Sequence, residues 1–163
     1  MSDITASIIH SVEAINRDYI CALDKLDMSA WLACFSKQGT YTFISEENER
    51  RGFPIAFMLD DCYERLQDRV VQVDEIQADS TEHYNMRHFT QLTSIEKVGT
   101  NRYQTNFNYS VYYTQKDTNT SKILCVGRYE DIIVIDEQGK GYFEQRKAVT
   151  DTNVLPRYIA YPV

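Results

Sequence analysis

The chain has 163 residues, of which 43% are hydrophobic and 25% are charged, and this composition suits one globular domain with a sizeable core. Its formal net charge of −7 leaves no basic excess to neutralise phosphates, which argues against nucleic-acid and anionic-membrane partners. No apolar stretch approaches the ~20 residues that span a bilayer, and the first residues lack the basic start and apolar run of a signal peptide. The sequence therefore predicts a cytoplasmic protein with no nucleic-acid or membrane partner.

Helical periodicity marks the first part of the chain. Apolar residues recur at steps of three and four from Ile4 to Leu23, which predicts one long amphipathic helix. Asp27 can cap a second, short helix, so helices are expected over about residues 3–36. A break follows, and the sequence TYTFIS at residues 40–45 favours a short strand.

A third helix is expected over about residues 54–74. The segment SEENERRG before it is polar and charged, which is typical of a loop. Pro54 is well placed in the first turn of this helix, because the N–H that proline lacks is not needed there. Apolar residues at helical spacing follow it, namely Ile55, Leu59, Tyr63, Leu66, Val70 and Val73.

The periodicity changes to two in the second half of the chain. One face of a long predicted strand carries apolar and aromatic residues, namely Tyr103, Thr105, Phe107, Tyr109, Val111 and Tyr113. Turn-like breaks at VGTN, QKDTNT and DEQGKG separate four such runs, so an antiparallel meander is expected over about residues 84–150. The whole chain, residues 1–163, is therefore predicted to be one α+β domain in which helices cover one face of a sheet.

The stretch DSTEHYNMRHF, residues 79–89, has the ingredients of a mononuclear iron site. Asp79, Glu82, His83 and His88 lie close together in the sequence. His83 and His88 are an odd number of residues apart, so a continuous strand would point their rings to opposite faces. A helix would place the two rings about 140° apart. We therefore expect no metal site here, and we expect His88 to be hydrogen-bonded at the sheet.

Cysteine usage gives no sign of a metal centre or a disulfide. Cys21, Cys34, Cys62 and Cys125 are scattered and form no CxxC pair. The sequence also has no Rieske-type CxH…CxxH pair, no glycine-rich phosphate loop and no GxS nucleophile elbow. The cysteines are therefore expected to be reduced and mostly buried.

Acid–base chemistry in a pocket remains an open alternative. An aromatic row on a curved sheet that helices cover can either fill the core or line a pocket. In the second case, His88, Asp61 and Tyr109 are the candidate catalytic residues, with Tyr41 and Tyr63 as further acid–base groups. The chain would then be a stand-alone dehydratase or isomerase.

Several segments follow one another in a recognisable order: WLACF, DDCYERLQDRV, MRHF, the long tyrosine-rich strand, VGRYED and QRKAVTDTNVLP. In this order and spacing, which spans nearly the whole chain, they resemble the small (β) subunits of aromatic-ring-hydroxylating (Rieske non-haem iron) dioxygenases. The resemblance implies the cystatin-like fold of nuclear transport factor 2, ketosteroid isomerase and scytalone dehydratase. In that fold a curved antiparallel sheet is covered by N-terminal helices.

The same resemblance implies a non-catalytic structural subunit. In such dioxygenases the large (α) partner holds the Rieske 2Fe–2S cluster and the mononuclear Fe(II), and it dihydroxylates the aromatic compound. The β chains form a trimeric base in an α3β3 assembly. For this chain, the resemblance implies an α-subunit partner, self-association as a trimer, and no catalytic, cofactor-binding or metal-binding residue. The short length and brief hairpins look more like subunits paired with enzymes for aromatic carboxylic acids.

Two sets of residues are predicted to have structural roles. Arg87 and Glu130 lie in β-runs, and neighbouring strands are expected to bring them together as a partly buried pair. The sheet face away from the helices is predicted to be the trimer interface, because tyrosine and arginine on a mixed face combine contact area with hydrogen bonds. Its residues are Tyr112, Arg128, Val126 and Val134, with Leu124 and Ile132 beside them.

Overall fold

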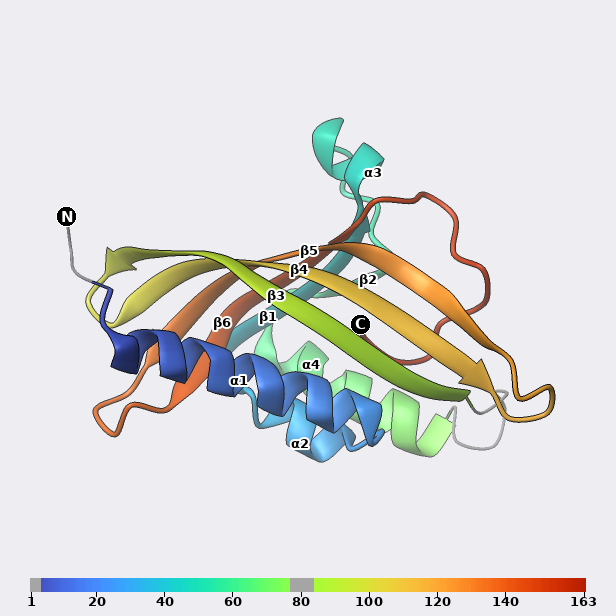
Figure 1. Ribbon diagram of the computed structural model, residues 1–163, viewed down its shortest axis with the longest axis horizontal. Helices are drawn as coiled ribbons and strands as arrows, with labels where there is room; N and C mark the ends of the chain where they lie inside the picture. The colour runs from blue at the N-terminus through green and yellow to red at the C-terminus, as the bar shows by residue number, and fades with distance from the viewer. Residues whose placement is uncertain (1–3, 77–83) are drawn as a thin grey trace.

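A twisted, curved six-stranded sheet forms one layer of the protein, and helices α1, α2 and α4 cover one of its faces (Figure 1). The computed structural model describes residues 4–76 and 84–163. The helices are α1 (Ala6–Asp24), α2 (Met28–Leu32), α3 (Glu46–Arg50) and α4 (Tyr63–Val71), and the π-helical turn η1 (Gln72–Ile76) continues α4. The strands are β1 (Phe35–Ser45), β2 (Met58–Asp60), β3 (Tyr84–Gly99), β4 (Arg102–Gln115), β5 (Ser121–Ile135) and β6 (Gly141–Thr150). The predicted α+β class is confirmed.

Capping side chains fix the starts of the first two helices. The Thr5 hydroxyl accepts a hydrogen bond from the Ile8 N–H at 3.3 Å and begins α1. The Asp27 carboxylate accepts one from the Ala30 N–H at 2.9 Å and begins α2, as predicted. One stripe of α1 is buried against the sheet, and its apolar members are Val12, Ile15, Tyr19, Ala22 and Leu23. No helix of the described residues is long and apolar enough to cross a membrane.

The predicted third helix is wrong in its first half. Residues 53–57 form no helix, and β2 then pairs with the edge of β1, with Asp60 opposite Tyr41. The Phe57 N–H donates to the Phe43 carbonyl at 2.7 Å, so this segment finds its backbone partners on β1 rather than within a helix. Ile55 is consequently 64% exposed, although helical spacing had placed it on a buried face.

A short helix also interrupts the segment that was expected to be a loop. The Ser45 hydroxyl accepts a hydrogen bond from the Asn48 N–H at 3.3 Å and begins α3. This helix projects from the sheet on the side away from α1, α2 and α4 (Figure 1).

The predicted antiparallel meander is confirmed, since β3, β4, β5 and β6 are joined in sequence by antiparallel pairing. The full strand order is β2-β1-β6-β5-β4-β3. One pair departs from the antiparallel sheet that was expected: β1 runs parallel to β6, with Phe43 opposite Ala148. β1 therefore joins the sheet through the strand most distant from it in the sequence.

Aromatic rings fill the space between the helices and the sheet. Tyr19 is fully buried and its ring centroid lies between 5.5 and 6.5 Å from those of Phe143, Phe35 and Trp31. These pairs are edge-on or tilted, the geometries that aromatic quadrupoles favour. On the sheet, Tyr109 stacks on Tyr129 at 4.3 Å. Of the two possibilities for the aromatic row, the rings here fill the core.

A charged pair lies inside this aromatic core. The Arg146 guanidinium donates to both carboxylate oxygens of Asp131, at 3.1 and 2.9 Å, and also to the Asn16 side-chain oxygen at 2.8 Å. Both members of the pair are fully buried. Burial raises the pKa of the Asp131 carboxyl, and the nearby guanidinium opposes this shift. The pair connects β5, β6 and α1.

The expected pairing of Arg87 with Glu130 is wrong. Arg87 is on β3 opposite Tyr112, whereas Glu130 is on β5 opposite Asn106. Six residues of β4 separate those two register positions, which corresponds to about 20 Å along the strand. Arg87 is exposed and donates to the Met86 carbonyl at 2.7 Å.

The expectation that Leu124 faces away from the helices is also wrong, because the side chain is 2% exposed. The register between β4 and β5 shifts at this point: Val111 opposes Cys125, and Tyr112 opposes Ile123. Leu124 is the extra residue of this bulge, and it turns inward. Ile123, 51% exposed, takes its place on the outer side.

Removing the buried guanidinium should destabilise the protein strongly. Arg146→Met keeps an unbranched apolar stem but leaves the Asp131 carboxylate buried without its partner, so the free energy of unfolding should fall by about 3–5 kcal/mol. Urea unfolding followed by circular dichroism measures this change. The double variant Arg146→Met/Asp131→Leu should recover part of the loss, because no charge is then orphaned. A single variant as stable as the wild type would contradict a structural role for the pair.

Candidate functional site

The last residue of α1 is tied to the sheet by a carboxylate–imidazole contact. His88 Nδ1 on β3 lies 2.6 Å from Asp24 Oδ1, and the His88 side chain is fully buried. The His88 backbone N–H also points to Asp24, at 3.4 Å from Oδ2. His88 Nε2 is buried and finds no hydrogen-bond partner among the described residues. The expectation of a hydrogen-bonded His88 at the sheet is confirmed, and we refer to this contact as the Asp24–His88 pair.

The other predicted catalytic residues do not assemble with His88 into a triad. Asp61 is exposed and lies 3.3 Å from Arg65 in an i,i+4 ion pair at the start of α4. Tyr109 is on β4 and faces inward, two residues from Val111, the residue opposite His88. His88 and Tyr109 are thus diagonal neighbours on one face, and Asp61 is engaged elsewhere. Asp24, 64 positions from His88, is the partner that sequence reasoning missed.

The iron-like stretch is described only from residue 84 onward. Asp79, Glu82 and His83 lie outside the described residues. Across residues 4–76 and 84–163, no group of three or more histidine, cysteine, aspartate or glutamate side chains is arranged to hold a metal ion. The prediction that this chain holds no metal therefore stays a prediction.

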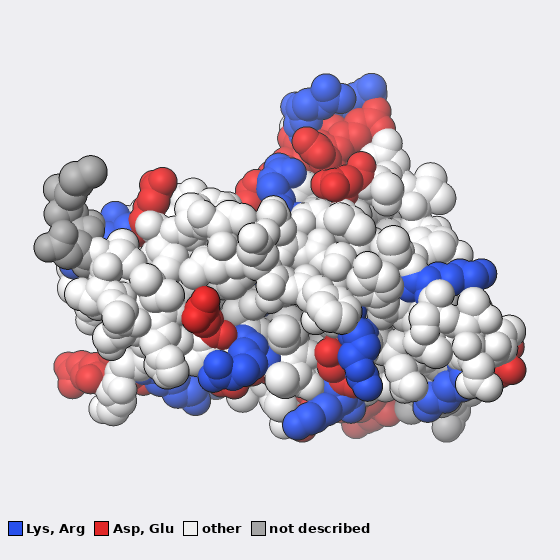
Figure 2. Space-filling view, viewed as in Figure 1, with Lys and Arg blue, Asp and Glu red and all other residues white. Residues whose placement is uncertain are grey.

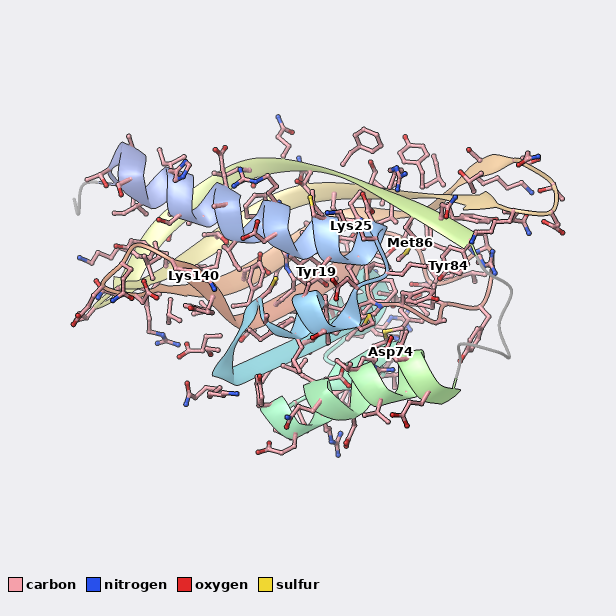
Figure 3. All side chains as sticks on the ribbon, turned by 90° about the horizontal axis from the view of Figure 1, so that it is seen from below. Tyr19, Lys25, Asp74, Tyr84, Met86 and Lys140 are labelled. Atoms are coloured by element: carbon pink, nitrogen blue, oxygen red, sulfur yellow. The ribbon has the colours of Figure 1, made fainter. Side chains whose placement is uncertain are left out.

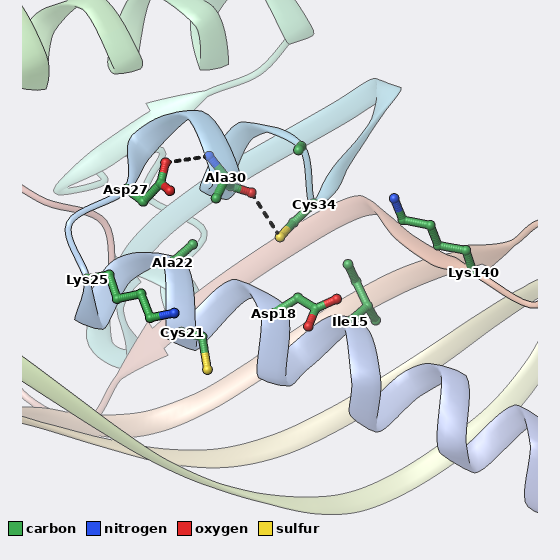
Figure 4. Close-up of a pocket in the computed structure, with 10 residues that line it drawn as sticks. Ile15, Asp18, Cys21, Ala22, Lys25, Asp27, Ala30, Cys34 and Lys140 are labelled. Atoms are coloured by element: carbon green, nitrogen blue, oxygen red, sulfur yellow. Dashed lines mark hydrogen bonds between the residues drawn. The ribbon is translucent and has the colours of Figure 1, made fainter.

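A groove of about 330 Å³ runs between α1 and α2 (Figure 4). Lys25 and Lys140 come from opposite ends of it, and Asp18 and Asp27 also line it, so its charges are mixed. Cys34 lies in its wall, with Sγ 3.4 Å from the Ala30 carbonyl oxygen. The mixture of charges and the open shape define no particular ligand.

Apolar side chains gather on the sheet face opposite α1, α2 and α4. On β4, Tyr112 lies opposite Ile123 of β5. Ser110, also on β4, lies opposite Phe89 of β3 and Val126 of β5. Four side chains form an apolar patch, with exposed fractions of 62% for Phe89, 38% for Tyr112, 51% for Ile123 and 40% for Val126. The Phe89 and Tyr112 rings meet edge to face at 5.6 Å.

A charged network lies beside this patch and holds α3 over the sheet. Arg128 donates to Glu49 on α3 at 2.9 Å and to Glu130 at 2.8 Å, and Lys147 contacts both glutamates. Opposite charges raise the pKa of Lys147 against the effect of its partial burial. Charged side chains gather on the α3 projection, whereas the surface over the neighbouring strands is largely uncharged (Figure 2).

The four main predicted interface residues lie on this outer side of the sheet, whereas Leu124, which was expected beside them, does not. Tyr112 and Val126 belong to the apolar patch, and Arg128 is part of the charged network. Val134 is partly buried further along β5. Phe89 and Ile123 share the patch and were not predicted. The period-two pattern of β3 could have indicated Phe89, but the β4–β5 bulge that exposes Ile123 leaves no mark in the sequence.

Comparison with known proteins assigns the chain to a family. The family model described as ring hydroxylating beta subunit matches residues 20–157. Two β subunits of the terminal oxygenase component of terephthalate 1,2-dioxygenase from Comamonas sp are 26% identical over 153 residues, which is 93% of this chain and 96% of theirs. The β subunit of a candidate aromatic-ring-hydroxylating dioxygenase from Novosphingobium aromaticivorans has a similar structure, with a TM-score of 0.77, 26% identity and 88% of each chain covered.

The fold is the nuclear-transport-factor-2-like, cystatin-like fold that was expected. A ketosteroid isomerase-like protein from Erwinia carotovora shares it, with a TM-score of 0.61 over 91% of this chain and 99% of that chain, at 11% identity. This chain belongs to the ring-hydroxylating β subunit family, and it is a β subunit of an aromatic-ring-hydroxylating dioxygenase.

Breaking the Asp24–His88 pair should loosen α1 from the sheet. Asp24→Ala leaves a buried imidazole without its acceptor, so the free energy of unfolding should fall by about 1–3 kcal/mol. Asp18→Ala is the matched control, because Asp18 lies on the same helix but is exposed. Chemical denaturation of both variants measures the difference. Equal stability of the two variants would show that the contact contributes nothing.

The cysteines should differ sharply in reactivity. Burial raises the pKa of Cys34 and of Cys125 to about 12, so both thiols stay protonated at pH 8, whereas Cys21 is exposed. Ellman's reagent should therefore modify Cys21 quickly in the native protein, and Cys34 and Cys125 only after unfolding. Cys21→Ser should remove the fastest phase. Rapid labelling of Cys34, located by mass spectrometry, would contradict this assignment.

Proposed function

We propose that this chain is a non-catalytic structural subunit that forms a homotrimer and holds α subunits in an α3β3 dioxygenase. In this assembly the α subunits carry the Rieske 2Fe–2S cluster and the mononuclear Fe(II), and they dihydroxylate an aromatic compound. An aromatic carboxylic acid fits best, since the Comamonas relatives belong to a terephthalate dioxygenase. This chain supplies no catalytic residue and no iron ligand.

The apolar patch is the observation that carries the proposal of self-association. Two aromatic and two aliphatic side chains are clustered on rigid, neighbouring strands, and each is at least 38% exposed. Protein interfaces combine such an apolar centre with a polar, charged rim. Here the rim is the network of Glu49, Arg128, Glu130 and Lys147. A contiguous patch of this kind marks an interaction site more often than an isolated exposed side chain does.

A filled core fits a structural role. The rings of Tyr19, Trp31, Phe35 and Phe143 are packed against one another between the helices and the sheet. One fold can carry different functions at different sites. We therefore expect the function of this chain to depend on the exposed face of its sheet rather than on an internal pocket.

A second candidate function rests on the Asp24–His88 pair. A carboxylate that orients an imidazole is part of many acid–base sites, and the Nε2 atom is left for proton transfer. In that case the chain is a stand-alone dehydratase or isomerase that uses His88 with Tyr109. Such an enzyme converts a small substrate without an α subunit and loses this activity on His88→Ala. The structural subunit has no activity alone, whether His88 is present or not.

A charge placed in the apolar patch should prevent trimer formation. Val126→Asp buries a carboxylate at the proposed interface, so we expect sedimentation velocity to show a trimer for the wild type and a monomer for the variant. Val71→Asp on α4 is the matched control, since Val71 is 46% exposed and Val126 is 40% exposed. Circular dichroism should show both variants folded. A wild-type chain that is monomeric at all concentrations would contradict the proposal.

The link to α subunits is tested separately. Co-expression of the wild-type chain with a Rieske-type α chain should give a coloured complex that co-purifies. Val126→Asp should reduce the yield of this complex and its turnover together, whereas Val71→Asp should leave both unchanged. An α chain with full activity in the absence of this chain would contradict the structural role.

A further inference from the structure

The final residues of the chain enter the layer between the helices and the sheet. Ala160 is 2% exposed, Tyr161 7% and Val163 0%, although the preceding Tyr158 is 67% exposed. The chain passes along the sheet and ends beneath the strands (Figure 1). We call residues 160–163 the plug segment, because they occupy space that belongs to the core.

Two tyrosine hydroxyls bind this segment through hydrogen bonds, and we call Tyr19 and Tyr41 the tyrosine seat. Tyr19 on α1 and Tyr41 on β1 both donate to the backbone oxygen of Val163, at 2.8 and 3.2 Å. The Val163 N–H in turn donates to the Tyr41 hydroxyl at 3.0 Å. Both tyrosines are fully buried, and Tyr19 points from α1 into the layer between helices and sheet (Figure 3). Burial raises both pKa values, which keeps these hydroxyls neutral and able to donate.

Aromatic side chains pack around the plug segment near the tyrosine seat. The Tyr161 ring lies edge-on against that of Tyr84 at 5.7 Å, and Tyr84 also contacts Tyr113 at 6.1 Å. The Arg157 guanidinium lies 4.0 Å from the centre of the Tyr84 ring. An occupant of this place therefore meets aromatic faces, a cation near the entrance and two hydroxyl donors at the inner end.

A cleft of about 380 Å³ leads to the plug segment from the surface. It lies between β2, α4 and the last residues, and Ala160 forms part of its lining. Arg157 and Arg69 both line it, and Arg69 is paired with Asp60 at 2.9 Å. The cleft therefore borders the plug segment at Ala160.

We propose that the plug segment is a built-in occupant of a binding site for small aromatic carboxylic acids. In this site the Tyr19 and Tyr41 hydroxyls, which now hold the Val163 oxygen, donate to the carboxylate of the ligand. The ring of the ligand takes the place of the Tyr161 side chain against Tyr84. This site goes beyond the structural role and does not depend on trimer formation or on an α subunit.

Because the plug segment is part of the chain, it competes with any free ligand. A ligand that binds only the open form has an apparent affinity reduced by the fraction of molecules that are open. Removing the segment should therefore reveal the site, and ligand binding should in turn displace the segment.

The first test uses benzoate and a chain that ends at Ile159. Isothermal titration should show one benzoate bound per shortened chain, with an affinity at least about tenfold higher than for the 163-residue chain. Replacing both hydroxyls in the shortened chain, Tyr19→Phe with Tyr41→Phe, should weaken binding by about tenfold or more, since hydrogen bonds to a carboxylate are lost. Tyr112→Phe, on the outer face, is the control and should bind as before.

The second test uses the 163-residue chain and is independent of whether the shortened chain folds. Benzoate at high concentration should increase hydrogen–deuterium exchange in the plug segment, measured by mass spectrometry, because the Val163 N–H loses its partner. Exchange in β4 and β5 should stay unchanged. Benzoate that leaves exchange in the plug segment unaltered, or a folded shortened chain that binds no benzoate, would overturn the proposal. Neither outcome bears on trimer formation, so the two proposals can fail separately.

Discussion

The ion pair between Arg146 and Asp131 sets the geometry of this domain. The guanidinium lies 3.9 to 4.1 Å from the ring centres of Tyr129, Tyr19 and Phe143, and its hydrogen bonds reach β5 and α1. Burying this charge costs desolvation energy, which the Asp131 carboxylate, the Asn16 side-chain oxygen and the three ring faces offset. The long first helix, the last strand and its neighbour are therefore held in one arrangement, and the aromatic rings pack around that arrangement.

This packing fills the layer between the sheet and the helices and leaves the opposite face of the sheet exposed to solvent. On the inner side, α1 is fixed at Asn16 by Arg146 and at Asp24 by His88. On the outer side, the apolar patch and the charged network lie on the same strands, so their positions follow from the register of β3, β4 and β5. A rigid sheet that is packed on one face suits a subunit whose work is to hold others in place.

The sequence predicts the regular parts of this structure well because local periodicity determines them. The alternation from Tyr103 to Tyr113 reflects a strand with one buried face, and the Asp27 cap is a local contact. Contacts between distant residues leave no such pattern. In the sequence, Arg146 is one of two adjacent cations in QRKAVT, and nothing there predicts that it is buried. Likewise, no residue near His88 in the sequence indicates Asp24 as its partner. The helix expected from Pro54 does not form for the same reason, because residues 57–60 make their backbone hydrogen bonds with the distant strand β1.

The parallel pairing of β1 with β6 has a consequence for synthesis of the chain. The strand at residues 35–45 leaves the ribosome about a hundred residues before its partner at residues 141–150. During that time β1 lacks the strand that it pairs with in parallel, and the rings of Tyr19 and Phe35 lack their neighbour Phe143. The pairing of β1 with β6 is therefore a late contact between distant residues, of the kind that slows folding. The aromatic surface that stays exposed until β6 is made is of the kind that promotes aggregation of incomplete chains.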